Sequence, residues 1–326
     1  MKKVYLLLLL WSISITCFSQ TIQSSGAGSG DWNDPLSWTP NTVPTNANSS
    51  AIIINNGHTI TLTAIATIDQ TTINSGGVLI INSGITLTLN NGTGDELTVS
   101  SGATITNNGT IAFGTIPPRT MIVNGTLNNT GVLSGSASSK LIFNSGSNYF
   151  HQFADGGTIP AAAWNAASTV HIVGYTSGNS TPPSGLGQTF GNFVWNSPAQ
   201  DVTIILGGLP TSINGSFTVA DTGVDVLFYS AGGSGGTMNI GGSLNVTGGV
   251  LGWTSGDAGP STLNVSGDIA FSSGYTQLGD DQNLTINVTG NFSVSGDAQV
   301  DFAATAAITN LNLQGNYTFT GRKIFS

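Results

Sequence analysis

The stretch that decides the fold of this chain is LNVSGDIAF, residues 263–271, because the same nine-residue phrase returns at nearly equal intervals. The other copies are MNIGGSLNV (238–246), INVTGNFSV (286–294), LNLQGNYTF (311–319) and a weaker TSINGSFTV (211–219). Their shared glycines are separated by 27, 25, 23 and 25 residues; these are Gly215, Gly242, Gly267, Gly290 and Gly315. A repeat of this period is typical of a solenoid, in which each unit buries its apolar face only against its neighbours.

Within the phrase, positions 1, 3, 7 and 9 are apolar and the residues between them are polar or small. This alternation predicts two short strands, each with one buried face. The central glycine turns the chain between them, where a positive φ or a close backbone approach is needed. We therefore expect an all-β fold, a right-handed parallel β-solenoid (β-helix) with coils of about 20–25 residues.

The second position of the phrase is asparagine in four copies: Asn239, Asn264, Asn287 and Asn312. Stacked coils would place these amides in one column, each able to hydrogen-bond the amides above and below. The sequence thus predicts a structural asparagine ladder, and a ligand-binding column is the alternative.

The chain begins with Met1-Lys2-Lys3, followed by a short apolar run and by small residues around Cys17. This pattern predicts a secretory signal peptide over residues 1–19. We expect a secreted or cell-surface protein with no transmembrane segment in the mature chain, because the apolar run is too short to span a bilayer. Cys17 is the only cysteine, so the mature fold is expected to lack disulfides.

The rest of the chain divides by pattern into four further regions. They are an N-terminal cap (20–48), a first solenoid segment (49–146), an irregular aromatic-rich coil or insertion (147–210) and a second solenoid segment (211–326) that we expect to continue beyond Ser326. In the cap, Trp32 and Trp38 are predicted to cover the apolar end of the first coil, as a solenoid requires. An uncovered last coil would favour end-to-end self-association.

The aromatic-rich region holds the candidate binding residues. The candidates for a carbohydrate site are Trp164, Trp195, Tyr149 and His151. Breaks in a repeat often carry binding loops, and such rings could stack on a glycan. The alternative is a local hydrophobic plug.

Charged residues make up only 6% of the chain. Without residues 1–19, four cationic residues remain against fifteen acidic ones, a net charge of −11. Nucleic acids and anionic membranes bind clustered Lys and Arg, so the composition excludes both as partners. The neutral polar residues instead suit glycans or other surface proteins.

Catalytic chemistry has little support in the sequence. The acidic residues are scattered; Asp268, Asp281, Asp297 and Asp301 are the ones that neighbouring coils could bring together, and Glu96 is the only glutamate. The three histidines have no metal-ligand spacing. We therefore expect no catalytic residue, no metal and no cofactor, and predict that the chain is not an enzyme.

Two segments carry a family resemblance. Residues 30–62, with GDWNDPLSW, Val43-Pro44 and AIIINNGHTITL, and residues 146–172, with GSNYFH and STVHI, resemble large secreted β-solenoid surface proteins of Bacteroidetes, of the type IX secretion cargo type. The resemblance implies an exported, outer-membrane-associated, adhesin-like structural module and maps no catalytic residue. The alternatives are a carbohydrate-binding or polysaccharide-degrading exoprotein and a self-associating extracellular matrix protein.

Overall fold

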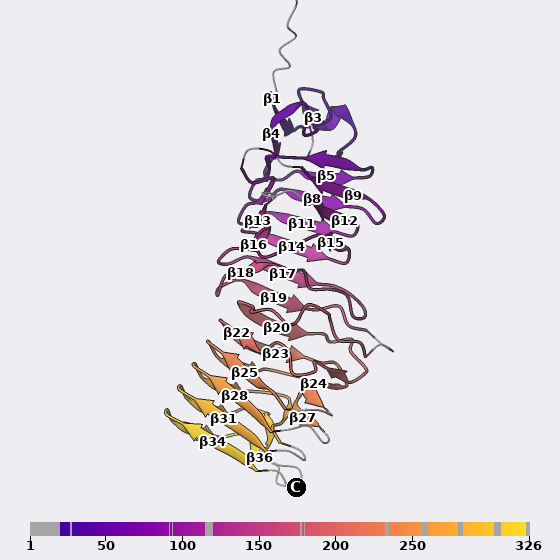
Figure 1. Cartoon of the computed structure of the whole chain (residues 1–326). Coiled ribbons are helices and arrows are strands. Elements are labelled where there is room, and N and C mark those ends of the chain that lie inside the picture. Colours follow the sequence, from indigo (N-terminus) through magenta and orange to yellow (C-terminus); the bar gives the residue numbers. More distant parts are fainter. Residues whose placement is uncertain are drawn as a thin grey trace, which may run out of the picture.

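A computed structural model gives the fold, and it describes residues 20–26, 28–90, 92, 94–114, 120–176, 178, 180–231, 235–255, 260–279, 283–302 and 308–323. Over these residues the chain forms short strands and one 3-10 turn, η1 (Pro35–Ser37). The structure confirms the predicted all-β parallel solenoid: successive coils stack along one axis from the N-terminal to the C-terminal end (Figure 1). The predicted signal peptide, with Cys17, lies outside the described residues.

One parallel sheet of 13 strands runs through the whole solenoid. Its strands are, in spatial order, β2 (Ser29–Asp31), β5 (Thr59–Leu62), β8 (Val78–Ile81), β11 (Thr104–Asn107), β14 (Thr126–Asn129), β17 (Asn148–His151), β19 (Thr169–Ile172), β20 (Asn192–Asn196), β23 (Phe217–Asp221), β26 (Leu244–Val246), β29 (Ile269–Phe271), β32 (Phe292–Val294) and β35 (Tyr317–Phe319). The spatial order follows the chain order, so each coil adds its strand beside that of the coil before.

Two further sheets complete the coils of the N-terminal half. The eight-stranded sheet contains β18 (Ala163–Trp164), β16 (Leu141–Phe143), β13 (Met121–Val123), β10 (Leu97–Val99), β7 (Thr71–Ile73), β4 (Ser49–Ile54), β1 (Gln20–Ser24) and β3 (Trp38–Thr39). The four-stranded sheet contains β15 (Val132–Ser134), β12 (Thr110–Phe113), β9 (Thr86–Leu89) and β6 (Ala66–Ile68). The four coils from β4 to β15 therefore have three strands each, one more than the repeated phrase alone predicts, whereas the coils of β16–β17 and β18–β19 have two.

Two different sheets take their place in the C-terminal half. The six-stranded sheet contains β21 (Ile204–Ile205), β24 (Val226–Ala231), β27 (Val250–Ser255), β30 (Tyr275–Gln277), β33 (Gln299–Asp301) and β36 (Arg322–Lys323). The five-stranded sheet contains β22 (Ser212–Ile213), β25 (Thr237–Ile240), β28 (Ser261–Val265), β31 (Leu284–Val288) and β34 (Thr309–Leu313). The phrase supplies the strands of the five-stranded and 13-stranded sheets, and the residues between phrases supply the third strand.

The exchange of sheets takes place between β15 and β22, a stretch that includes the whole region predicted to be irregular, residues 147–210. The four-stranded sheet ends at β15 and the eight-stranded sheet at β18, whereas the C-terminal sheets begin at β21 and β22. Across this region β17, β19 and β20 stay in register, with Tyr149 opposite Val170 and Val170 opposite Phe193. The 13-stranded sheet therefore joins the two halves into one solenoid.

The core follows the alternation of the phrase. In the copy at 263–271, Leu263, Val265, Ile269 and Phe271 are buried, while Asn264 lies on the outer face. The same phase recurs in each coil, so the apolar side chains form one continuous buried column. Burial of this column supplies the main stabilisation, at about 25 cal/mol per Å² of apolar surface removed from water.

The N-terminal cap buries the two predicted tryptophans. Trp32 and Trp38 are both fully buried, and their rings meet edge to face with centres 4.9 Å apart. Trp38 Nε1 donates to the Trp32 carbonyl at 2.8 Å, and Trp32 Nε1 donates to the Pro44 carbonyl at 3.3 Å. Each buried indole N–H thus has an acceptor while its ring covers the apolar end of the first coil.

Candidate functional site

The four residues predicted to bind carbohydrate lie in the interior. Tyr149, His151 and Trp195 are fully buried, and Trp164 keeps only 7% of its surface exposed. Trp164 also stacks on Phe143, with ring centres 4.2 Å apart and 9° between the planes. Sugar stacking needs a ring face open to solvent, and these four rings offer none. Their arrangement is that of the hydrophobic plug, the alternative interpretation of this region.

The outward aromatic residues of the same region are Phe150 and His171. Strand alternation turns Phe150 outward between the buried Tyr149 and His151. Phe150 lies opposite His171 in the next coil, and their rings stack face to face at 4.3 Å with 7° between the planes. The two rings therefore cover one face of each other, and both side chains stay partly exposed.

A directed chain of hydrogen bonds runs through the plug. His151 Nε2 lies 2.7 Å from the Gly156 carbonyl, which can only accept, so Nε2 carries the proton and Nδ1 is the acceptor. The Tyr149 hydroxyl therefore donates to Nδ1 at 3.3 Å, and it accepts from Asn129 Nδ2 at 3.2 Å. Asn129 Oδ1 in turn accepts from Asn107 Nδ2 at 2.8 Å. Asn107, Asn129 and His151 are fully buried and occupy the same register position in three successive coils.

Burial controls the protonation of this chain. It lowers the pKa of His151 to about 4, against a smaller opposing effect of the hydrogen bond to Gly156. Burial also raises the pKa of Tyr149 above its ordinary range. Both groups are therefore neutral at physiological pH and closed off from solvent. They satisfy one another inside the core and are not available to exchange protons with a substrate.

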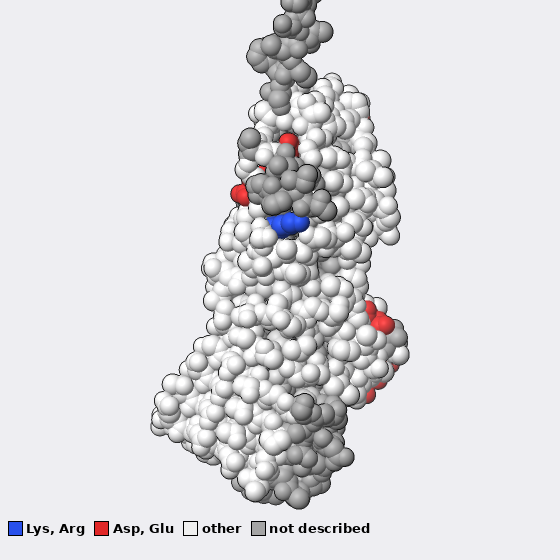
Figure 2. Space-filling model, viewed as in Figure 1, with Lys and Arg blue, Asp and Glu red and all other residues white. Residues whose placement is uncertain are grey.

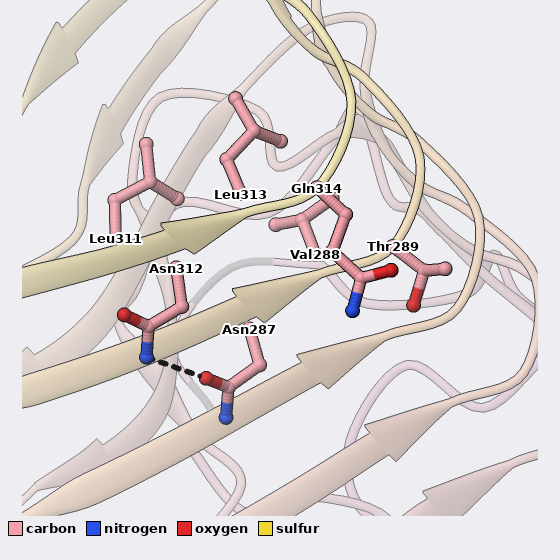
Figure 3. Close-up of a pocket in the computed structure, with 7 residues that line it drawn as sticks. All are labelled: Asn287, Val288, Thr289, Leu311, Asn312, Leu313 and Gln314. Atoms are coloured by element: carbon pink, nitrogen blue, oxygen red, sulfur yellow. Dashed lines mark hydrogen bonds between the residues drawn. The ribbon is translucent and has the colours of Figure 1, made fainter.

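The asparagine column is a hydrogen-bonded ladder. Asn264 Nδ2 donates to Asn239 Oδ1 at 2.8 Å, Asn287 to Asn264 at 2.7 Å, and Asn312 to Asn287 at 2.8 Å. Strand pairing brings the four residues directly opposite one another on the outer face of the five-stranded sheet. Figure 3 shows the last rung, with Asn287 and Asn312 on one side of their strands and Leu311 and Leu313 on the other.

The phrase glycines form a second column beside the ladder. None of the five has a positive φ, so the close backbone approach explains them. The Gly267 N–H donates to the Gly242 carbonyl at 2.8 Å, and a Cβ atom on Gly267 would lie 2.7 Å from that oxygen. Such a distance is a steric clash, so the corner can turn only with glycine. Positive φ does occur at corners of the N-terminal half, as at Gly84 and Gly102.

One of the scattered acidic residues, Asp268, holds a chain corner. Asp268 Oδ1 accepts from the Asn291 backbone N–H at 2.7 Å and from its side chain at 3.2 Å. Asp301 is buried, with the Tyr275 hydroxyl 3.4 Å from its Oδ2, and Asp297 is exposed. Asp281 lies outside the described residues. Among those described, no group of three His, Cys, Asp or Glu side chains is placed to hold a metal ion.

One pair of carboxylates, Asp69 and Glu96, was not predicted from the sequence. Burial and the nearby charge of Glu96 raise the pKa of Asp69. Paired carboxylates are the minimum for glycoside hydrolysis. However, Glu96 is fully buried, and its oxygens accept from the backbone N–H groups of Gly92 and Thr120. Glu96 therefore closes the chain corner before β10. Strand pairing sets Thr71 opposite Leu97 and so brings the residues just before them, Asp69 and Glu96, close together. The N-terminal repeat is too irregular for this register to be predicted from the sequence.

Two surface hollows accompany these features. One, of about 470 Å³, follows the edge strand β34 and is lined by Asn287, Val288, Thr289, Leu311, Asn312, Leu313 and Gln314 (Figure 3). The other, of about 400 Å³, lies where the four-stranded sheet ends and includes Val132, Leu133, Phe153 and Pro160. Neither hollow brings together groups that suggest a catalytic reaction.

Comparison with known proteins adds no relative. No protein-family model, no curated protein and no solved structure matches this chain. Over the residues that the structure describes, no helix has the length and apolar character needed to cross a membrane. The resemblance to Bacteroidetes surface proteins stays a prediction.

Proposed function

We propose that this chain is an exported structural module, an adhesin-like stalk at the cell surface or outside the cell, with no catalytic activity of its own. The observation that supports the proposal is the unbroken 13-stranded sheet from β2 to β35. Its twelve strand-to-strand steps of about 4.8 Å correspond to a length of roughly 58 Å. A chain in which nearly all residues form an extended rod is suited to holding an attached domain or partner away from the cell surface.

The low content of charged residues is compatible with the same role. Figure 2 shows few acidic or basic side chains on the displayed face of the described molecule. The buried column, the glycine corners and the asparagine ladder repeat along the axis, so a coil can be added or removed without a new core. Export rests on the predicted signal peptide at residues 1–19.

The proposal is tested by altering the length of the rod in the producing cells. Deleting residues 264–286 joins Leu263 to Asn287 and removes one coil in register. We expect the shortened chain to fold with a rod about 4.8 Å shorter. In the producing cells, protease added outside the cell should cleave the chain. Deletion of the gene should reduce adhesion of the cells. Retention inside the cell, or unchanged adhesion without the gene, would contradict the proposal. Release of sugars from polysaccharides by the purified chain would contradict its non-catalytic part.

A further inference from the structure

The outer face of the five-stranded sheet carries two parallel rows of neutral hydrogen-bonding side chains. One row is the asparagine ladder. The other lies two residues earlier on each strand: Thr237, Thr262, Thr285 and Asn310. The ladder accounts for the first row as a structural feature, but the second row takes no part in it.

The two rows form a regular grid. The strand pairs β25–β28, β28–β31 and β31–β34 have no register shift, and the three ladder bonds agree within 0.1 Å, at 2.8, 2.7 and 2.8 Å. Where sheets are flat, side-chain ladders of this kind are one of the features that stabilise them. The grid spacing is about 4.8 Å between coils and about 7 Å along each strand, twice the rise per residue.

The ladder leaves part of each amide free to bind outward. An asparagine amide has two N–H donors and an oxygen with two lone pairs. Asn264 uses one donor toward Asn239 and one lone pair toward Asn287. One donor and one acceptor remain on each inner rung, and their direction is fixed by the ladder. The second row adds a hydroxyl and a methyl group beside Asn239, Asn264 and Asn287, and an amide, that of Asn310, beside Asn312. The ladder amides are already ordered, so they lose little side-chain entropy on binding.

The composition of the face limits what can bind it. Its two rows contain only Asn and Thr, and Figure 2 shows no acidic or basic side chain over strands β25, β28, β31 and β34 on the displayed face. The outer face of the 13-stranded sheet is less regular, because Phe150, His171 and Val194 follow one another there. An ionic partner has nothing to pair with on the grid, whereas a neutral, periodic, hydrogen-bonding surface complements it.

We propose that this face binds ice. The spacing between coils is close to an oxygen repeat of hexagonal ice, so water held by successive Asn and Thr side chains is positioned to continue the lattice. The threonine methyl groups exclude disordered water between these positions. A crystalline glycan is the competing neutral surface, but the sugar repeat of a β-linked chain is longer than one coil and loses register with the grid. The inference is independent of the stalk role.

The test uses the purified chain and a growing ice hemisphere. We expect the fluorescently labelled protein to be incorporated into the ice and to slow ice recrystallisation. Thr285→Tyr, at the centre of the grid, should abolish both effects. Ser293→Tyr is the matched control, since Ser293 is equally half-buried in the same coil but on the 13-stranded sheet, and it should leave both effects intact. If Thr285→Tyr fails to fold by circular dichroism, Thr262→Lys places a long side chain on the same face and should have the same effect.

Three outcomes would overturn the inference. The first is exclusion of the wild-type chain from growing ice. The second is equal incorporation of the folded Thr285→Tyr and Ser293→Tyr variants, which would move the binding surface elsewhere. The third is binding to microcrystalline cellulose without incorporation into ice, which would identify the face as a glycan-binding surface.

Discussion

Replacing His151 with asparagine is expected to remove a loss of stability that the wild-type chain suffers on acidification. His151 is fully buried and neutral, with Nδ1 accepting from Tyr149 and Nε2 donating to Gly156. Protonation would place a charge in the core and take away the acceptor that the Tyr149 hydroxyl uses. Asparagine already stands at the equivalent position in the two preceding coils, as Asn107 and Asn129, so the substitution keeps the column polar.

The magnitude follows from the pKa difference. An unfolded histidine has a pKa of about 6.5 and folded His151 a pKa of about 4. Between these values the unfolded chain binds a proton that the folded chain does not, so stability falls as the pH falls through this window. The total loss from pH 7 to below pH 4 is about 3 kcal/mol, since one pKa unit corresponds to about 1.4 kcal/mol. Above about pH 6.5 the histidine contributes no pH dependence.

The assay is urea denaturation from pH 4 to pH 8, followed by tryptophan fluorescence. Trp164 reports on the region directly, because its ring centre lies 5.8 Å from that of Tyr149. Carboxyl groups add their own pH dependence, so the quantity compared is the difference in slope between wild type and His151→Asn. Tyr149→Phe is the control: it should lower stability by about 1–3 kcal/mol at neutral pH, because it removes a buried hydrogen bond, and it should keep a pH dependence between pH 4 and 6.5, because the titrating group remains. Equal slopes for wild type and His151→Asn between pH 4 and 6.5 would refute the reasoning.

Three further substitutions test other parts of the fold. Gly267→Ala should destabilise the chain by about 1–3 kcal/mol, because its Cβ would press on the Gly242 carbonyl. The control is Gly187→Ala, where a Cβ meets no atom within 4 Å, and it should change the melting temperature little. Asn264→Ala breaks two ladder bonds and should cost about 1–2 kcal/mol in denaturant titrations, and an unchanged midpoint would mean that the ladder adds no stability. Trp38→Ala should cost about 3–5 kcal/mol and speed hydrogen exchange in β1 and β4, and unchanged exchange there would contradict its capping role.

The repeated phrase was sufficient to predict the architecture because its physics is local. Alternation at Leu263, Val265, Ile269 and Phe271 defines two strands with one buried face, and the recurrence of the phrase requires the coils to stack. The column at Asn264 follows from the same register. The third strand of the three-stranded coils was not predicted, because its sequence varies too much between coils to be recognised as a repeat.

The glycine and aromatic predictions needed information that spacing does not contain. The phrase glycines could serve either a positive φ or a close approach, and only the neighbouring carbonyl, as at Gly242 below Gly267, decides between them. Trp164 and Trp195 lie in a region without a clear repeat. The sequence therefore does not predict whether their side chains face the core or the solvent. Strand alternation does predict that Tyr149 and His151 share one face and that Phe150 lies on the other. It does not say which of the two faces is buried.

The continuity of the solenoid is tested most directly by a distance measured along the 13-stranded sheet, because a single rod must cross the sheet exchange between β15 and β22 without a break. Spin labels at Thr61→Cys in β5 and Ser293→Cys in β32, in a Cys17→Ser background, stand ten strand-to-strand steps apart in that sheet. Double electron–electron resonance should give one narrow distribution centred near 48 Å, ten times the strand spacing of about 4.8 Å. A broad distribution, or a distance much shorter than this, would contradict the continuous solenoid and the stalk that it supports.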